Sequence, residues 1–217
     1  MKKIKYSQKT KSINQNKKLP TNEEEYWFKV HENLIAADIP KRFQNLNFDS
    51  IKINKEIVKP VKILRTYVEK FDVLSKKGVS GFLSGNPGTG KTMLACIVIS
   101  EIIKQGYTSK YILAWELLQY LRKSYLHKDI DIQKRINEFT YPDLLIIDEI
   151  GIQHGSNDER ILLYQIINSR YSKIKSTILI SNSISPIKDG FIDERIMDRL
   201  KENSGFNINL NIKSFRK

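Results

Sequence analysis

The chain has 217 residues, of which 40% are hydrophobic and 28% charged, and its formal net charge is +13. This length suits one compact domain, and no apolar stretch approaches the ~20 residues of a membrane-spanning helix. The basic N-terminus lacks the apolar segment of a secretory signal, and a single cysteine, Cys96, excludes an internal disulfide. We therefore expect a cytoplasmic protein without a membrane partner.

Residues 1–20 are basic and polar without hydrophobic periodicity, which predicts a disordered tail. Seven lysines and no acidic residue occur within residues 1–22. This charge favours contact with nucleic acid phosphates. The chain is, however, rich in lysine, isoleucine and asparagine together, as an AT-rich genome would produce for any function. DNA binding by the tail therefore stays an open alternative.

A short helical, partner-binding region is expected at 21–50, and its main helix at 22–38. Asn22 can cap this helix, and Glu25 follows three residues later, as in a capping box. One face of the helix is apolar, which indicates either a docking surface for a partner or packing against the chain's own core. The side chains on that face are Trp27, Val30 and Leu34.

The remainder, residues 51–217, is expected to form one α/β domain that begins with a helix at 60–71. Short apolar runs then predict buried strands at 79–84, 111–115, 143–148, 177–181 and 206–212. Helical patterns lie between most of these runs, at 91–105, 116–127 and 159–172. This alternation predicts a five-stranded, mostly parallel sheet with helices on both faces.

A glycine-rich loop after the first expected strand, "SGNPGTGKT", matches the phosphate-binding pattern G-x-x-x-x-G-K-[ST] in full. Glycines let successive backbone N–H groups face the phosphates, and the following helix adds its positive dipole end. Lys91 would reach the β- and γ-phosphates, and the Thr92 hydroxyl would bind Mg²⁺. The predicted loop consists of Gly85, Asn86, Pro87, Gly88, Thr89, Gly90, Lys91 and Thr92.

A pair of carboxylates ends the strand expected at 143–148. Asp148 falls at the carboxyl end of that strand, where open α/β sheets bind their ligands, and would hold Mg²⁺. Glu149 can orient and activate water against the γ-phosphate. The pair therefore favours ATP hydrolysis over transfer to a small acceptor.

Polar side chains later in the chain add candidates to the same site. Asn182 ends the strand at 177–181 and could contact the γ-phosphate or the attacking water. Arg195 and Arg199 are spaced to share one helix face in "DERIMDRL". They form either surface salt bridges or an arginine finger that reaches the γ-phosphate of a neighbouring subunit.

Taken together, "IPKRFQNLNFDS", "SGNPGTGKT", "DLLIIDEIG" and "ERIMDRLKENSG" resemble an AAA+ ATPase, and more narrowly the bacterial replicative helicase loaders of the DnaC/IstB-like family. The resemblance runs from about residue 39 to the C-terminus. It implies ATP and Mg²⁺ as cofactors, single-stranded DNA as a ligand, and assembly in a spiral on the hexameric replicative helicase. It also implies that the loader holds the helicase open and places it on the strand.

The resemblance also implies a role for each matching residue. Lys91 and Thr92 correspond to Walker A, and Asp148 and Glu149 to Walker B. Asn182 takes the sensor position, and Arg199, which precedes a bulky apolar residue, is the first choice for the finger, with Arg195 second. The segment facing the DNA channel contains Arg122, Lys123 and Tyr125, although an amphipathic helix with a solvated basic edge explains it as well.

Two departures from the loader pattern stand out. Only about 38 residues precede the matching region, so the helix at 22–38 would have to serve as the whole grip on the helicase. The stretch after Leu200 is too short for the C-terminal helical lid of many AAA+ proteins, and so no lid is expected. We therefore expect slow hydrolysis that depends on assembly, because a neighbouring subunit completes the site.

Three other functions fit parts of the pattern. An IstB-type transposition helper would share the ATPase core but bind double-stranded DNA and a transposase. A small-molecule kinase would need an arginine-rich lid and an acceptor pocket, neither of which the sequence indicates. An ATP-binding adaptor without useful hydrolysis would not need Glu149.

Overall fold

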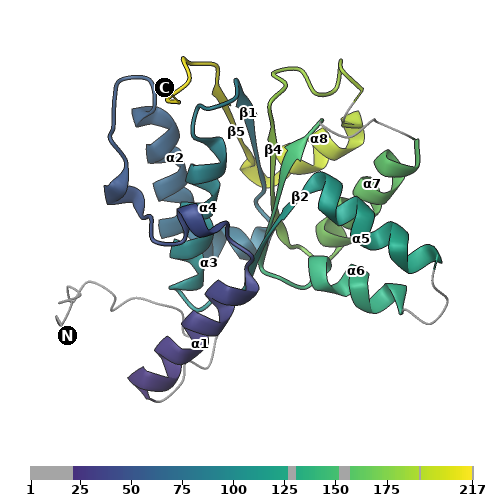
Figure 1. The fold of residues 1–217 in the computed structure, drawn as a ribbon, viewed down its shortest axis with the longest axis horizontal. Helices are drawn as coiled ribbons and strands as arrows, with labels where there is room; N and C mark the ends of the chain where they lie inside the picture. Colours follow the sequence, from purple (N-terminus) through teal and green to yellow (C-terminus); the bar gives the residue numbers. More distant parts are fainter. Residues whose placement is uncertain (1–21, 127–130, 152–156, 191, 217) are drawn as a thin grey trace.

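The computed structural model describes residues 22–126, 131–151, 157–190 and 192–216, so the tail predicted at 1–20 lies outside the described residues. Its centre is one sheet in the order β2-β3-β4-β1-β5 (Figure 1). Every neighbouring pair of strands is parallel, as the strand–helix alternation predicts. The strands are β1 (Gly81–Gly85), β2 (Ser109–Leu113), β3 (Leu144–Ile150), β4 (Ser176–Ser181) and β5 (Phe206–Leu210).

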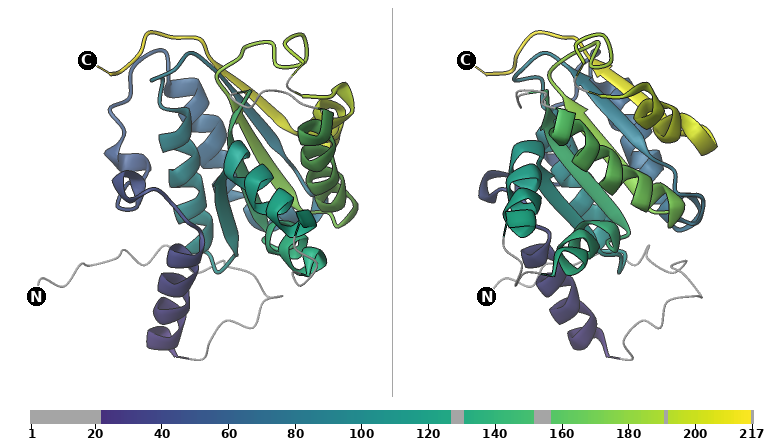
Figure 2. Two further views of the ribbon diagram at one scale, coloured as in Figure 1. Left: turned by 45° about the vertical axis from the view of Figure 1, so that its right-hand side comes forward. Right: turned by 90° about the vertical axis from the view of Figure 1, so that its right-hand side faces the viewer.

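Helices cover both faces of the sheet (Figures 1 and 2). One face carries α1 (Glu23–Ala36), α2 (Val58–Glu69), α3 (Phe71–Leu74) and α4 (Lys91–Ile103). The other face carries α5 (Ala114–Leu126), α6 (Ile132–Thr140), α7 (Asn157–Ser172) and α8 (Glu194–Lys201). Short 3-10 helices are η1 (Lys41–Phe43), η2 (Phe48–Ser50), η3 (Ser75–Lys77) and η4 (Glu202–Ser204). No helix in these described ranges is both long and apolar enough to cross a bilayer.

The apolar core lies in two clusters, one on each side of the sheet. Along β3, Leu144 and Ile146 belong to the first cluster, whereas Leu145 and Ile147 belong to the second. Successive side chains of a strand point to opposite faces, so a strand buried on both faces must be apolar throughout. This is why the strands appear in the sequence as continuous apolar runs rather than as alternating patterns.

The helix α1 packs its inner side against the first cluster. Asn22 caps it by accepting a hydrogen bond from the Glu24 N–H at 3.0 Å. Val30 is buried in the core and Leu34 packs against it, so the apolar face predicted at 22–38 serves the chain's own core at these positions. Trp27 is exposed on the outer side.

Most element boundaries differ from the sequence prediction by one or two residues, and the helix α6 was not predicted. The strand expected at 111–115 ends at Leu113, because Ala114 and Trp115 already belong to α5. The strand β3 runs two residues further than expected, to Ile150. The helix α6 is absent from the prediction, since only its last two residues are buried and its apolar pattern is therefore short.

A fully buried arginine joins α6, α7 and the start of β4 on the second side of the sheet. Arg170 donates from Nη1 to the carbonyls of Phe139 at 2.8 Å and Pro142 at 3.0 Å. It also donates to the Ser176 carbonyl and, at 2.9 Å, to the Thr177 hydroxyl. Burial lowers the pKa of Arg170 to about 9, so the guanidinium stays charged at neutral pH. It satisfies carbonyl groups that water cannot reach.

Replacing Arg170 with leucine should lower the free energy of unfolding by about 3–5 kcal/mol, because the buried carbonyl groups lose their donors. Urea denaturation would measure this change. Arg65→Leu is the control, since Arg65 makes its ion pair with Asp49 and its contact with the Phe48 ring at the surface and should cost about 1 kcal/mol or less. Equal effects of the two substitutions would contradict the anchoring role of Arg170.

Candidate nucleotide and magnesium site

A cavity of about 660 Å³ lies at the carboxyl edge of the sheet. It contains the loop after β1, the carboxylates at the end of β3 and Asn182 after β4. The structure thus brings together residues from three strand ends that the sequence analysis selected separately. The predicted site residues that line the cavity are Pro87, Gly88, Thr89, Gly90, Lys91, Thr92, Asp148, Glu149 and Asn182.

The loop between β1 and α4 has a backbone that requires glycine. Gly85 has φ +132°, and a Cβ added there would lie 2.3 Å from the Leu210 carbonyl oxygen. Gly90, at φ +88°, caps α4 without a side-chain acceptor for the first N–H groups of the helix. These N–H groups and the helix dipole favour an anion at this position.

Lys91 is only 5% exposed and lies under the loop. Its Nζ donates to the carbonyls of Gly85 at 2.7 Å and Asn86 at 2.8 Å. Burial lowers the pKa of Lys91, an effect that the nearby Asp148 carboxylate partly offsets. A buried ammonium whose hydrogen-bond acceptors are neutral carbonyls gains from an anion brought beside it.

The Asp148 carboxylate is buried in the cavity, and the residue is only 2% exposed. Its Oδ2 accepts hydrogen bonds from the Thr92 hydroxyl at 2.7 Å and from the Tyr111 hydroxyl at 3.0 Å. Its Oδ1 accepts from the Glu149 N–H at 2.6 Å. Sequence reasoning missed Tyr111, because a tyrosine inside a buried strand carries no motif.

The oxygens of Thr92 and Asp148 fit Mg²⁺, which prefers hard oxygen ligands and usually keeps phosphate or water in its shell. Within the described ranges, no three His, Cys, Asp or Glu side chains gather as a protein-only metal site. The Thr92 and Asp148 oxygens suit a metal ion held jointly with a phosphate, because Mg²⁺ is usually bound by one or two protein ligands together with substrate phosphates.

Glu149 occupies a strained backbone position next to Asp148. Its φ is +58°, and the register between β3 and β4 shifts between Ile147 and Ile150. Such a bulge redirects a side chain, here into the cavity. Burial and then the neighbouring Asp148 raise the pKa of the Glu149 carboxyl, which makes it a better proton acceptor than an ordinary glutamate.

Sequence reasoning also missed the segment after β5. Leu210 pairs with Gly85, so the following residues emerge beside the glycine-rich loop. Phe215 donates its N–H to the Gly88 carbonyl at 2.9 Å, and Arg216 lines the cavity. The pairing of β5 with β1 places this segment beside the glycine-rich loop. Local sequence patterns do not predict the order of strands in a sheet, so this proximity could not be predicted.

A second group of missed residues that line the cavity precedes α2 in the chain. Most of its side chains are apolar or basic, and the sequence analysis used only the part up to Ser50, for its resemblance to a family. They are Arg42, Phe43, Ser50, Ile51, Lys52 and Ile57.

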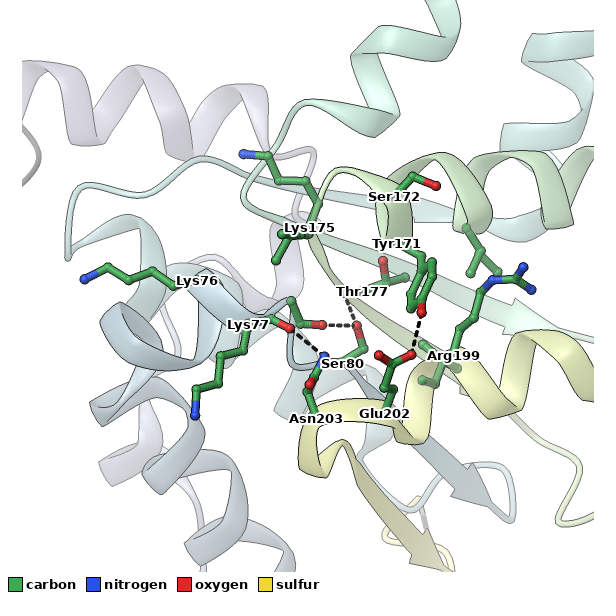
Figure 3. A pocket seen from close by; sticks show the side chains of 14 residues that line it. Lys76, Lys77, Ser80, Tyr171, Ser172, Lys175, Thr177, Arg199, Glu202 and Asn203 are labelled. Atoms are coloured by element: carbon green, nitrogen blue, oxygen red, sulfur yellow. Dashed lines mark hydrogen bonds between the residues drawn. The ribbon is translucent and has the colours of Figure 1, made fainter.

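Neither candidate finger arginine lines this cavity. Arg199 borders a different pocket of about 390 Å³, together with Ser80 and Thr177, at the opposite edge of the sheet (Figure 3). Its guanidinium donates to the Tyr164 hydroxyl at 2.9 Å and lies over the rings of Tyr164 and Tyr171.

Arg195 lies on the more exposed part of α8, with a side chain that is 67% exposed. It forms a two-pronged ion pair with Asp193, which lowers the pKa of the Asp193 carboxyl to about 2. Arg199, in contrast, has no carboxylate within ion-pair distance in the described part of the chain. The two arginines therefore differ in how freely they can meet an anion.

The residues predicted to face DNA belong to α5. Lys123 is exposed and Arg122 is half-buried. Tyr125 belongs to the same helix, but its side chain lies outside the described residues. Their relation to nucleic acid therefore stays a prediction.

The parallel sheet, the loop after β1 and the acidic pair at the end of β3 define a P-loop NTPase of the AAA+ type. The chain belongs to the family of IstB-like ATP binding proteins, whose model matches residues 29–217.

The chain is also similar to characterised replication proteins. It is 29% identical over 190 residues to the replicative helicase loader DnaC of Escherichia coli K12, covering 87% of this chain and 76% of that protein. A crystal structure of a DnaC helicase loader matches with a TM-score of 0.66 and 26% identity, over 80% of this chain and all of the other.

A more distant structure shares the fold alone. The replication initiator DnaA, solved with AMPPCP and single-stranded DNA, matches with a TM-score of 0.68 at 21% identity. The match covers 81% of this chain but only 52% of the initiator.

Proposed function

We propose that the chain binds ATP with Mg²⁺ in the cavity at the carboxyl edge of the sheet. The observation that carries this proposal is the convergence of Lys91, Thr92, Asp148 and Glu149 on one cavity. Lys91 neutralises the β- and γ-phosphates, and the loop N–H groups bind their oxygens. Thr92 and Asp148 hold the magnesium ion, which would neutralise charge on the β- and γ-phosphates.

The residues around the γ-phosphate of the bound ATP would carry out its hydrolysis. Glu149 accepts a proton from the attacking water, for which its raised pKa suits it. Asn182 orients that water or the γ-phosphate from the end of β4. Arg216, beside the loop, adds a positive charge from the same subunit. Phe43, Ile51 and Ile57 also line the cavity and supply apolar surface against which a base can pack.

Two substitutions separate binding from hydrolysis. Lys91→Ala should weaken ATP binding at least about 100-fold, because the phosphates lose their buried counter-charge. Glu149→Gln should leave the affinity within about threefold but slow hydrolysis about 100-fold or more. Binding of a fluorescent ATP analogue and phosphate release measure these effects.

The two variants serve as controls for each other. Unchanged ATP affinity in Lys91→Ala would contradict the phosphate-binding assignment. Full hydrolysis in Glu149→Gln would remove the proposed base. Because Glu149 gains its proton as pH falls through its raised pKa, the wild-type rate should fall on the acid side, starting at higher pH than for an ordinary glutamate.

Assembly of several subunits would complete the site. Arg199 is the better candidate for a finger in a neighbouring subunit, since aromatic rings orient its guanidinium and no carboxylate neutralises it in the described ranges. Arg195 would first have to leave Asp193. This proposal keeps the order of preference that the family resemblance implies.

Arg199→Ala should keep ATP affinity within about threefold and lose about 100-fold or more of the hydrolysis that assembly stimulates. Arg195→Ala is the matched control and should lose much less. Hydrolysis should be measured across protein concentration, so that the assembled and separate subunits are compared. If Arg199→Ala assembles and still hydrolyses ATP at the full rate, Arg199 has only a structural role.

We further propose that the chain loads the replicative DNA helicase onto single-stranded DNA, in an ATP-dependent spiral assembly. The likeness to helicase loaders over most of the chain supports this role. The outer face of α1 supplies an apolar surface for the helicase, where Phe28 and Ile35 are 64% and 66% exposed. Arg122, Lys123 and Tyr125 on α5 are the proposed contacts to the strand.

Co-purification with the replicative helicase, with and without ATP and single-stranded DNA, tests this function. The double substitution Phe28→Ser/Ile35→Ser should weaken helicase capture about tenfold or more and spare ATP affinity. Val73→Ser removes a similarly exposed apolar side chain from α3 and should change neither helicase capture nor ATP affinity. A helicase that is never retained by the wild-type chain would reject the loader function.

A transposition helper is the second candidate, because the matching family model is named for IstB-like proteins. Such a helper would retain a transposase and prefer double-stranded DNA. The same co-purification, with a transposase and with both forms of DNA, distinguishes the two functions.

A further inference from the structure

Tyr111 connects the end of α1 to the nucleotide cavity. Its hydroxyl donates to Oδ2 of Asp148 at 3.0 Å. Its backbone N–H donates to the carbonyl of Ala37, the residue after α1, at 2.8 Å. One residue of β2 therefore contacts both the proposed metal ligand and the residue that follows α1, the helix proposed to bind a partner.

The preceding residue of β2, Lys110, adds contacts between β2 and the end of α1. Lys110 donates to the Asp38 carboxylate and, at 3.3 Å, to the Ala36 carbonyl. Ala37 and Tyr111 are buried in the same apolar cluster as α4. A shift of β2 at Tyr111 must therefore move the last turn of α1, because packed interiors transmit small displacements.

The hydroxyl of Tyr111 is a hydrogen-bond donor at neutral pH, because a tyrosine side chain keeps its proton there. Thr92 also donates to Oδ2 of Asp148, and a hydroxyl that coordinates a metal ion through its oxygen keeps its O–H as a donor. Tyr111, Thr92 and the Glu149 N–H are therefore three donors that orient the carboxylate, and Tyr111 is the one of these that lies on β2.

We propose that Tyr111 is a positioning residue that orients Asp148 for Mg²⁺ and transmits the state of the nucleotide cavity to α1. The inference rests on the proposed ATP and Mg²⁺ binding and extends it to regulation of the partner-binding helix. Thermodynamic linkage then requires the reverse effect: a partner bound on α1 changes the affinity for Mg²⁺·ATP by the same factor.

The first test is a magnesium titration of ATP binding, with fluorescent ATP as the probe. Tyr111→Phe keeps the ring and removes the hydroxyl, and it should raise the Mg²⁺ concentration at half-saturation about tenfold. ATP affinity in EDTA should not change. Tyr67→Phe is the matched control, since Tyr67 is equally buried and donates to the Val79 carbonyl at 2.9 Å.

The second test is hydrogen exchange at residues 30–38 and at the Tyr111 amide. Addition of Mg²⁺·ATP should change the exchange rates there at least about threefold in the wild type, and this change should be lost in Tyr111→Phe. Lys110→Ala removes the surface contact and should reduce the change at 30–38 while sparing the magnesium titration.

The possible outcomes distinguish a failure of this inference from a failure of the proposed ATP and Mg²⁺ binding. If Tyr111→Phe titrates with Mg²⁺ as Tyr67→Phe does, Tyr111 does not position Asp148. If exchange at 30–38 responds to Mg²⁺·ATP equally in the wild type and Tyr111→Phe, the link to α1 is wrong. If the wild type and Lys91→Ala both fail to bind ATP, the proposed nucleotide site itself fails.

Discussion

The hydrogen bond between the Thr92 hydroxyl and the Asp148 carboxylate holds together the start of α4 and the end of β3. The strand before the phosphate-binding loop, β1, does not pair with β3, because β4 lies between them. Without this contact the phosphate-binding loop and the acidic pair would be two separate sequence features. With it, a cation bound at one reaches the other, which is what a magnesium-bound triphosphate requires.

Much of the fold follows from the sequence because each strand is buried on both faces and each motif is local. The five apolar runs and the loop at 85–92 needed no knowledge of distant contacts. Tyr111 and Arg216 could not be predicted in this way. Each enters the site through the order of strands in the sheet, which a single sequence with a local pattern does not specify.

For α1 and for the arginines of α8 as well, local patterns predicted the positions of side chains but not the residues that they contact. Periodicity placed Val30 and Leu34 on one face but could not say what covers that face; the structure shows that it is the chain's own core. Spacing placed Arg195 and Arg199 together, and the structure shows that both lie over the Tyr164 ring of α7. They differ in that Arg195 pairs with Asp193 in the turn before α8, whereas Arg199 lies over a second ring, that of Tyr171.

The segment that follows β5 has a practical consequence for anyone handling this chain. Phe215 is hydrogen-bonded to the phosphate-binding loop and Arg216 borders the cavity. A peptide joined after these residues would therefore start beside the lining of the cavity. A purification tag or fluorescent fusion placed there would crowd the entry of ligands, and an internal surface loop is the safer place for a label.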